Sequence, residues 1–265
     1  MVSADAAALF RGLEVLTAAP EYPARLVSLF DIEHDVSVGE FQRLAHAAID
    51  EVLAAERTPV VVGGSGLYLR AALTELELPP PPRAGARERW EAVYDEGPAA
   101  AHARLADLDP EAAVRVHLND RRRVVRALEL AEVGASLAGD ALWSHEARHP
   151  TLVFGLDVPD DVLDERIRAR AVEMLERGVV EEARRALARP LSPSARKVMG
   201  LSDFAELPPE EARDALVANN RRLARYQRKW LRRLRDVVPV DANRPAPDVA
   251  AEIVSVARTR GMLAA

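Results

Sequence analysis

The stretch "RTPVVVGGSGLYLRAAL", residues 57–73, combines a run of β-branched residues, a turn of small residues and a helical pattern. A strand that passes through glycines into a helix directs backbone N–H groups and the helix's positive end toward one point, which is how many proteins bind phosphate. The turn has no Lys, so it is not a P-loop. Gly63, Gly64 and Gly66 could instead only let the chain reverse tightly, and Ser65 could be an ordinary N-cap.

The segments around this turn indicate an α/β fold. Ser37 and Glu40 form a capping box, and apolar residues follow at helical spacing as far as Leu53. The strand at 59–62 is continuously apolar, which predicts a strand buried on both faces of a parallel sheet. The order helix, strand, turn, helix is typical of an α/β domain.

The pattern changes at "LPPPPRAG", residues 78–85, a stiff polyproline break. Residues 87–132 then predict helices without strands, and a strand returns at "TLVFGLDV", 151–158, before a helix from Pro159 to Arg177. A last strand is predicted at 237–242 and a closing helix at 246–258. We therefore expect an α/β core formed by residues 1–77 and 151–265, with a helical insertion at 78–150.

Composition narrows the class of protein. Of the 265 residues, 49% are hydrophobic, which is enough for one well-packed domain or a core domain plus a smaller one. The chain has no Cys, which excludes disulfides, Cys-ligated zinc and thiol nucleophiles. No apolar run reaches membrane-spanning length, so we expect a cytoplasmic protein without a membrane partner, and we expect it to be a monomer.

Basic residues are clustered although the net charge is −6. One cluster begins at Asn119, and a second begins at Asn219 and contains no acid before Arg235. In the second cluster helical spacing predicts two stripes, a cationic one and a packing one: Arg221, Arg225, Arg228, Arg232 and Arg235; Leu223, Tyr226, Trp230 and Leu234. Unneutralised like charges at these spacings repel, so contact with phosphates is favoured over a merely solvated face.

The letters "HEARH", residues 145–149, match the HExxH zinc motif. A zinc site needs both His145 and His149 on one face of a continuing helix, and a third ligand. Pro150 follows His149 directly and disfavours helical geometry there, and no later histidine exists. The sequence argues against a zinc site, and we expect no protein metal ligands.

In order along the chain, several segments resemble the tRNA dimethylallyltransferase family. "VSADAAALFRG" is similar to the family's SADSMQVYRG, "VVVGGSGLYLRAAL" to its GGTGLYLRAL, and "DPEAAVRVHLNDRRRVVRALEL" to its DPxxAxRIHPNDxxRxxRALE. "SARKVMGL" also aligns, and Gln227 and Trp230 match the family's RQxTWFR. The resemblance covers almost the whole chain. It implies an α/β fold with a P-loop-NTPase-like parallel sheet flanked by helices, and a helical insertion that contacts tRNA.

The chain departs from the family pattern in two ways. The family begins with a strand and a P-loop, GPTxSGKS, about thirty residues before the Asp motif, and neither is among these 265 residues. Because its Lys and Ser would grip the diphosphate and Mg²⁺, we expect the chain alone to lack measurable prenyl transfer. The family's Ser-Met-Gln is replaced by Ala6, Ala7 and Ala8, which removes a Gln suited to reading adenine.

The resemblance implies transfer of a C5 allylic group from dimethylallyl diphosphate to N6 of an adenosine beside the anticodon. Asp5 would accept a proton, and Ser65 would hydrogen-bond the departing diphosphate while Mg²⁺, held mainly through that diphosphate, neutralises the rest. The expected substrate- and tRNA-binding positions are the three alanines, the three glycines and a set of polar side chains: Arg87, Arg122, Arg123, Arg126, Arg225, Gln227 and Arg228. Two alternatives remain at this point, a catalytically inactive tRNA-binding paralogue and, remotely, an HExxH zinc protease.

Overall fold

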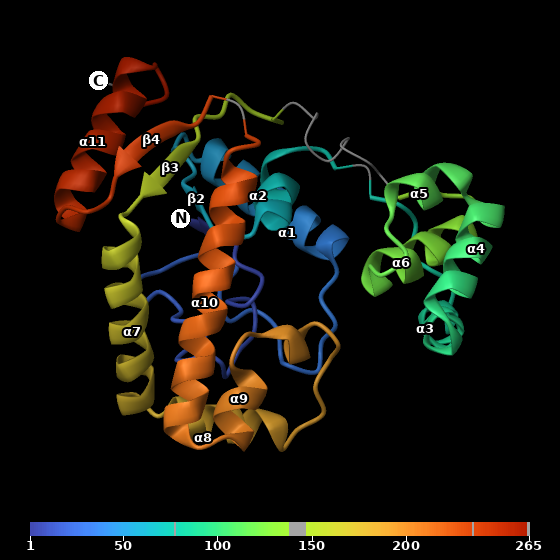
Figure 1. The fold of residues 1–265 in the computed structure, drawn as a ribbon. Helices are drawn as coiled ribbons and strands as arrows, with labels where there is room; N and C mark the ends of the chain where they lie inside the picture. The colour runs from blue at the N-terminus through green and yellow to red at the C-terminus, as the bar shows by residue number, and fades with distance from the viewer. Residues whose placement is uncertain (77, 138–146, 235, 264–265) are drawn as a thin grey trace. The chain divides into compact units, whose positions relative to one another are not determined.

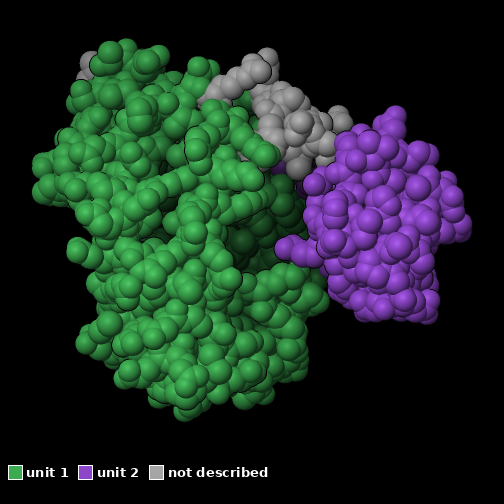
Figure 2. All heavy atoms as spheres, viewed as in Figure 1, with its two compact units in different colours: residues 1–75, 146–265 green, residues 76–145 purple. Residues whose placement is uncertain are grey.

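The computed structural model describes residues 1–76, 78–137, 147–234 and 236–263. The chain forms two compact units, residues 1–75 with 146–265 and residues 76–145 (Figure 2). The elements of the first unit, here called the core unit, are β1 Val2–Ser3, α1 Val38–Ala54, β2 Val61–Val62, α2 Gly66–Leu73, β3 Phe154–Asp157, α7 Asp160–Glu176, α8 Val179–Leu187, the 3-10 helix η2 Ala195–Lys197, α9 Leu201–Glu206, α10 Pro209–Leu231, β4 Val238–Asp241 and α11 Ala246–Thr259 (Figure 1). The insertion unit contains α3 Ala86–Glu96, α4 Pro98–Leu108, α5 Pro110–Arg115 and α6 Arg121–Ala131.

The described strands form two parallel pairs. β1 pairs with β2 through Val2 opposite Val61, and β3 pairs with β4 through Phe154 opposite Val238. The prediction that residues 59–62 are buried on both faces is wrong, because β2 pairs only with β1 among the described strands and Val60 is 57% exposed. The predicted strands at 151–158 and 237–242 are confirmed by β3 and β4.

Helix α1 follows its local sequence signals. The Glu40 N–H donates to the Ser37 hydroxyl at 3.1 Å, which confirms Ser37 as the N-cap, whereas the Glu40 carboxylate contacts His34 Nε2. Phe41, Ala45 and Ile49 are buried on one face. The Phe41 ring lies 4.6 Å from the Tyr68 ring, so this face packs against α2. No described helix is long and apolar enough to cross a lipid bilayer.

The long connection between β1 and α1 is anchored from α8. The buried Glu182 carboxylate accepts hydrogen bonds from the Val15 and Leu16 N–H groups at 3.1 and 2.8 Å. An unpaired buried carboxylate would be costly, and here both oxygens are used. The loop that begins at Asp5 is therefore ordered by contacts inside the core unit.

The insertion unit has its own hydrophobic core. Leu105, Val124 and Leu128 are fully buried among small residues of α4, α5 and α6. Asp109 and Asp120 accept hydrogen bonds from the first turns of α5 and α6, so each of these helices begins at an acidic N-cap. The prediction of helices without strands over residues 87–132 is confirmed.

Candidate active site

The first two strands place the predicted catalytic residues at one edge of their sheet. β1 and β2 run parallel, and the Ala4 N–H donates to the Val62 carbonyl at 2.7 Å where both strands end. Asp5 follows β1 directly, and Ser65 follows β2 after two glycines. Because carboxyl ends of parallel strands meet at the same edge, Asp5 and Ser65 both emerge there, which is where α/β folds bind ligands.

Asp5 shapes the loop that follows β1. Its Oδ1 atom accepts a hydrogen bond from the Ala7 N–H at 2.9 Å, and its own N–H donates to the Ser3 hydroxyl at 3.3 Å. Among the described residues no hydrogen bond occupies the Asp5 Oδ2 atom, so the carboxylate is held in place while one oxygen stays available. Ala6 and Ala7 are partly exposed, whereas Ala8 is buried.

Ser65 occupies the N-cap position of α2 without acting as a cap. Its backbone is extended and its carbonyl accepts from the Leu69 N–H at 2.9 Å, but its side chain makes no capping hydrogen bond. Ser37 differs, because its hydroxyl caps α1. The partly exposed Ser65 hydroxyl therefore stands at the positive end of a helix, where it can donate to an anion.

The glycines of the turn are required by space. A Cβ atom on Gly63 would lie within 3 Å of the Ala4 backbone, and one on Gly66 would lie 2.9 Å from the Trp230 indole. A Cβ atom on Gly64 would strike the side-chain amide of Gln227. Helix α10 thus packs directly on the turn, and the family-matched Gln227 and Trp230 lie against it.

Sequence reasoning missed Tyr68, one turn beyond Ser65 on α2. Burial raises the pKa of the Tyr68 phenol above its ordinary value, and the negative charges of Asp35 and Asp5 raise it further. The phenol therefore remains protonated at neutral pH and can donate a hydrogen bond beside Asp5. Its i,i+3 spacing from Ser65 was the available sequence signal.

The basic stripe of α10 is partly neutralised. The guanidinium of Arg221 pairs with both carboxylate oxygens of Asp164, and that of Arg228 pairs with Asp160 and the Val158 carbonyl. The expectation of an unneutralised stripe is therefore wrong for Arg221 and Arg228, because α7 lies alongside α10 and supplies acids (Figure 1).

The remaining described arginines of that stripe are not paired with acids. The Nε atoms of Arg225 and Arg232 donate to carbonyls of the preceding turn, and neither side chain makes an ion pair with a described residue. Arg235 is outside the described residues. Arg225 and Arg232 are both exposed, so their charges remain open to an anion.

The predicted packing stripe of α10 is also only partly correct. Trp230 is buried against the glycine turn, whereas Leu223 is exposed and Tyr226 is 63% exposed. The prediction that Leu223 and Tyr226 pack inward is wrong. It assumed that one face of α10 is covered along its whole length, but no residue between Val217 and Trp230 is buried.

In the insertion unit the predicted arginines fall into two groups. The fully buried Glu129 carboxylate pairs with Arg87 Nε and Arg126 Nη1, each at 2.9 Å. Arg122 and Arg123 are exposed, and neither makes an ion pair with a described residue. Glu129 therefore orients one pair of guanidiniums, while the charges of Arg122 and Arg123 remain exposed.

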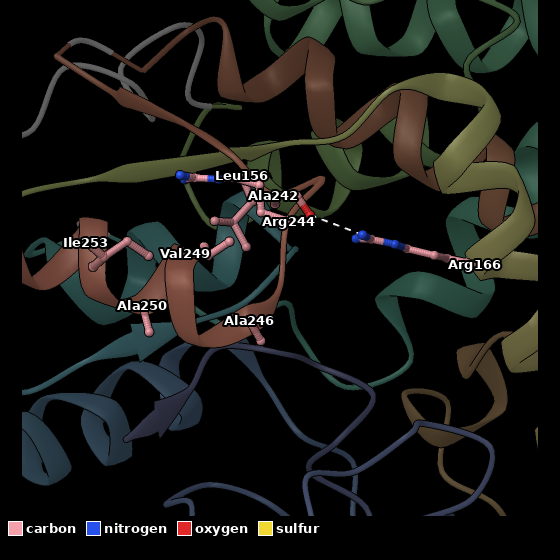
Figure 3. A pocket seen from close by; sticks show the side chains of 8 residues that line it. All are labelled: Leu156, Arg166, Ala242, Arg244, Ala246, Val249, Ala250 and Ile253. Atoms are coloured by element: carbon pink, nitrogen blue, oxygen red, sulfur yellow. Dashed lines mark hydrogen bonds between the residues drawn. The ribbon is translucent and has the colours of Figure 1, made fainter.

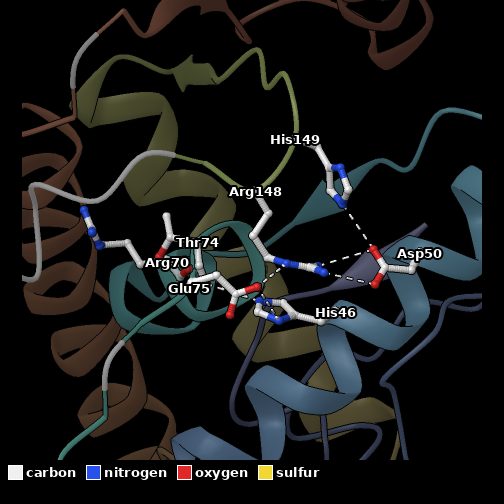
Figure 4. Close-up of polar contacts among 7 residues, drawn as sticks. All are labelled: His46, Asp50, Arg70, Thr74, Glu75, Arg148 and His149. Carbon is white, nitrogen blue, oxygen red and sulfur yellow. Dashed lines mark hydrogen bonds and ion pairs between the residues drawn. The ribbon is translucent and has the colours of Figure 1, made fainter.

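The HExxH segment takes part in a polar cluster of the core unit (Figure 4). Arg148 donates to both oxygens of Asp50 at 3.3 and 3.1 Å and to Glu75 at 2.6 Å, and His149 Nε2 lies 3.1 Å from Asp50 Oδ1. The hydrogen bonds that Asp50 accepts, chiefly those from Arg148, lower the pKa of Asp50, and donating to Asp50 is the largest cause of the raised pKa of Arg148.

This cluster does not suit zinc. His149 is not helical, as Pro150 predicts, and among the described residues no group of three or more His, Cys, Asp or Glu could hold a metal ion. His145 lies outside the described residues. The polar contacts of the cluster instead join α1 to the chain on either side of the insertion.

A shallow groove of about 450 Å³ lies elsewhere in the core unit, between β3, α7 and α11 (Figure 3). Its walls are mainly apolar, with Leu156 and Val249 among them. The Arg166 side chain at its edge donates to the Ala242 carbonyl at 3.2 Å, and Arg244 pairs with Glu252. None of the predicted site residues lines this groove.

Comparisons with known proteins agree with the resemblance. A family model described as IPP transferase matches residues 8–234. The chain is 39% identical over 247 residues to a tRNA dimethylallyltransferase of Thermobifida fusca, covering 88% of this chain and 77% of the relative. A Corynebacterium jeikeium protein of the same name is 36% identical, with coverage of 95% and 86%. The crystal structure of a tRNA isopentenylpyrophosphate transferase from Bacillus halodurans superposes with a TM-score of 0.67 at 29% identity, covering 97% of this chain and 86% of that one.

Proposed function

Because the chain belongs to the IPP transferase family, we propose that it transfers a dimethylallyl group from dimethylallyl diphosphate to N6 of an adenosine in tRNA, beside the anticodon. In this reaction the N6–C bond forms as the allylic C–O bond breaks. Diphosphate leaves with the bonding electrons, and one proton leaves N6. The chain must therefore accept a proton and stabilise a departing anion.

Asp5 is the proton acceptor in this proposal. The N6 amine is a weak nucleophile because its lone pair is conjugated with the ring, so removing a proton during attack assists the reaction. The Ala7 N–H holds one carboxylate oxygen, and this contact leaves the other to receive the proton. The raised pKa of Tyr68 keeps that neighbouring phenol protonated and able to donate to a polar group of the substrate.

Ser65 and the start of α2 receive the negative charge. A hydroxyl that is not used in capping, at the N-terminus of a helix, can donate to the diphosphate as charge develops on it. Magnesium commonly binds through one or two carboxylates and the substrate's phosphates. When bound, Mg²⁺ would neutralise charge on the diphosphate.

The tRNA contacts are proposed on both units. Arg122 and Arg123 suit flexible phosphate contacts, while Glu129 presents Arg87 and Arg126 as an oriented pair. On α10, Arg225 is open to an anion, and Gln227 lies at the glycine turn beside the reacting groups. Arg228 supports this surface through its ion pair with α7.

The proposal rests on one observation: Asp5 and Ser65 both emerge at one edge of the β1–β2 pair, and the Ser65 hydroxyl makes no capping hydrogen bond. The test measures single-turnover prenyl transfer at saturating tRNA in the chain joined to a family-type strand and P-loop. Asp5→Asn keeps an oxygen for the Ala7 N–H and should lower the rate by about 10² to 10⁴, the usual contribution of a general base. Ser65→Ala should lower it by about 10 to 10³.

Ser37→Ala is the matched control, because it also removes a serine hydroxyl from an N-cap position. Its hydroxyl does cap α1, so this change should lower stability and leave the saturated rate within a few-fold. Affinity for tRNA should change little in all three variants. Full turnover by Asp5→Asn, or equal effects of the two serine changes on the rate, would contradict the assigned roles.

A further inference from the structure

Tyr226 is an exposed aromatic side chain on a helix that otherwise buries its aromatic residue. It is 63% exposed, whereas Trp230, one turn later on α10, is buried. Leu223, one turn earlier, is also exposed. An exposed ring on a helix is accessible to a flat apolar ligand.

The position of Tyr226 brings it to the border of the candidate active site. Its chain neighbour Gln227 contacts Gly64, and Trp230 contacts Gly66. Residues four apart lie on the same side of a helix, so Tyr226 and Trp230 share one side of α10. The exposed ring thus lies one turn from the indole that covers the glycine turn.

Cations surround this ring, and described acids do not neutralise them. Arg222 and Lys229 lie one turn to either side of Tyr226, and Arg225 precedes it directly. Arg222 donates only to the neutral amide oxygen of Asn219, Arg225 donates to a carbonyl, and Lys229 makes no ion pair with a described residue. These three cations and Tyr226 are called the Tyr226 face.

We infer that the Tyr226 face binds an unpaired nucleotide of the RNA, with the base stacked on the Tyr226 ring and neighbouring phosphates on Arg222 and Lys229. An aromatic ring between cations matches both parts of a single-stranded nucleotide, the flat base and the charged backbone. A paired RNA helix matches only the cations, because its bases are stacked inside the helix. The inference rests on the proposed function only in taking tRNA as the source of the nucleotide.

The experiment measures affinity of the 265-residue chain for two RNAs across a salt series, a stem-loop with the unpaired anticodon loop and a fully paired duplex of equal length. Tyr226→Leu removes the ring and keeps a good helix former, and it should weaken stem-loop binding about 5- to 150-fold, the range for one stacked base. Its salt slope should not change. Tyr226→Phe should bind within about two-fold of wild type, because it keeps the stacking surface.

Two further variants separate stacking from charge and from folding. Lys229→Met should weaken binding to both RNAs and reduce the salt slope by about 0.7 to 0.9 for each phosphate that the protein no longer neutralises. Tyr22→Leu changes another exposed tyrosine of the core unit and should leave both affinities unchanged. Circular dichroism confirms that each variant is folded.

Unchanged stem-loop affinity in folded Tyr226→Leu would overturn the inference, as would an equal loss for the paired duplex. Prenyl transfer is measured separately on the wild-type sequence joined to a P-loop segment. If stacking is found without transfer, the proposed function fails and this inference stands. If transfer is found but Tyr226→Leu has no effect on stem-loop affinity, this inference fails and the proposed function stands.

Discussion

Replacing Gly63 by alanine tests whether the glycine turn is glycine-rich for reasons of space. The new Cβ atom would lie within 3 Å of the Ala4 carbonyl carbon and oxygen. Ala4 cannot retreat easily, because its N–H is bonded to the Val62 carbonyl at 2.7 Å. The ends of β1 and β2 must therefore move apart.

The expected loss follows from two opposing terms. Overpacking of this kind costs about 1–3 kcal/mol. The lower conformational entropy of alanine in the unfolded chain returns about 0.4–1 kcal/mol. The free energy of unfolding should fall by about 1.3 kcal/mol at the midpoints of these ranges, and by up to about 2.6 kcal/mol. Turnover should fall further, by about 10²-fold, if Asp5 and Ser65 separate by about 1 Å.

Gly64→Ala is the matched control in the same turn. Its Cβ atom meets only the end of the Gln227 side chain, which can rotate away, so stability should change by less than about 0.5 kcal/mol. Gly66→Ala should be intermediate, because the Trp230 ring at 2.9 Å is buried and less mobile. Urea unfolding measures stability, and single-turnover transfer by the chain joined to a family-type strand and P-loop measures the site. Equal losses for Gly63→Ala and Gly64→Ala would refute the explanation by close approach to the backbone.

Two further predictions concern ion pairs. The lowered pKa of Asp50 means that its pair with Arg148 stabilises the fold above the ordinary carboxyl pKa, and that this contribution is lost as pH falls through the lowered pKa. Asp50→Asn should therefore lower Tm at neutral pH, and the difference from wild type should shrink as pH falls below the ordinary carboxyl pKa. A Tm difference that does not change with pH would contradict this. In the insertion unit, Glu129→Ala leaves Arg87 and Arg126 without their buried partner. The change should lower the protection of α6 against hydrogen exchange by about 3 kcal/mol. This value is near the lower end for a broken buried ion pair, because the partly exposed guanidiniums can rehydrate. The double change Arg122→Ala with Arg123→Ala should leave the protection of α6 unchanged. It should reduce the salt slope of tRNA binding by about 0.7 to 0.9 for each phosphate left unneutralised. A fall in α6 protection in this double variant would argue against the division into arginines paired with Glu129 and exposed arginines.

The elements that sequence predicted well are those specified by neighbouring residues. The N-cap hydrogen bond between Ser37 and Glu40 acts over three positions, and α1 begins there. Pro159 precedes the first turn of α7, where proline's fixed backbone angle is favourable. Such signals do not depend on the rest of the fold, so a single sequence is sufficient to find them.

The errors arose where burial depends on distant parts of the chain. The apolar run at 59–62 would be buried with strands on both sides, but β2 has one described neighbour and Val60 is exposed. Tyr68 was missed because its environment depends on Phe41 and on the charges of Asp35 and Asp5, which come from other segments. For the glycine turn, composition suggested an anion cradle, whereas the close approach of the Ala4 backbone to Gly63 and of α10 to Gly64 and Gly66 explains why side chains are excluded.

Helix α10 shows how a basic run can be divided by its neighbours. Seven cations occur from Arg221 to Arg233 without an acid, and at i,i+3 and i,i+4 spacing they repel one another. Asp160 and Asp164 neutralise Arg228 and Arg221 from α7, at sequence separations of 68 and 57 residues. This pairing holds α10 against α7 and leaves the charges of Arg222, Arg225 and Lys229 without an ion pair to a described residue. A polyanion that binds the exposed side therefore relieves repulsion within α10 as well as making its own contacts, so RNA binding should stabilise this helix more than the others of the core unit.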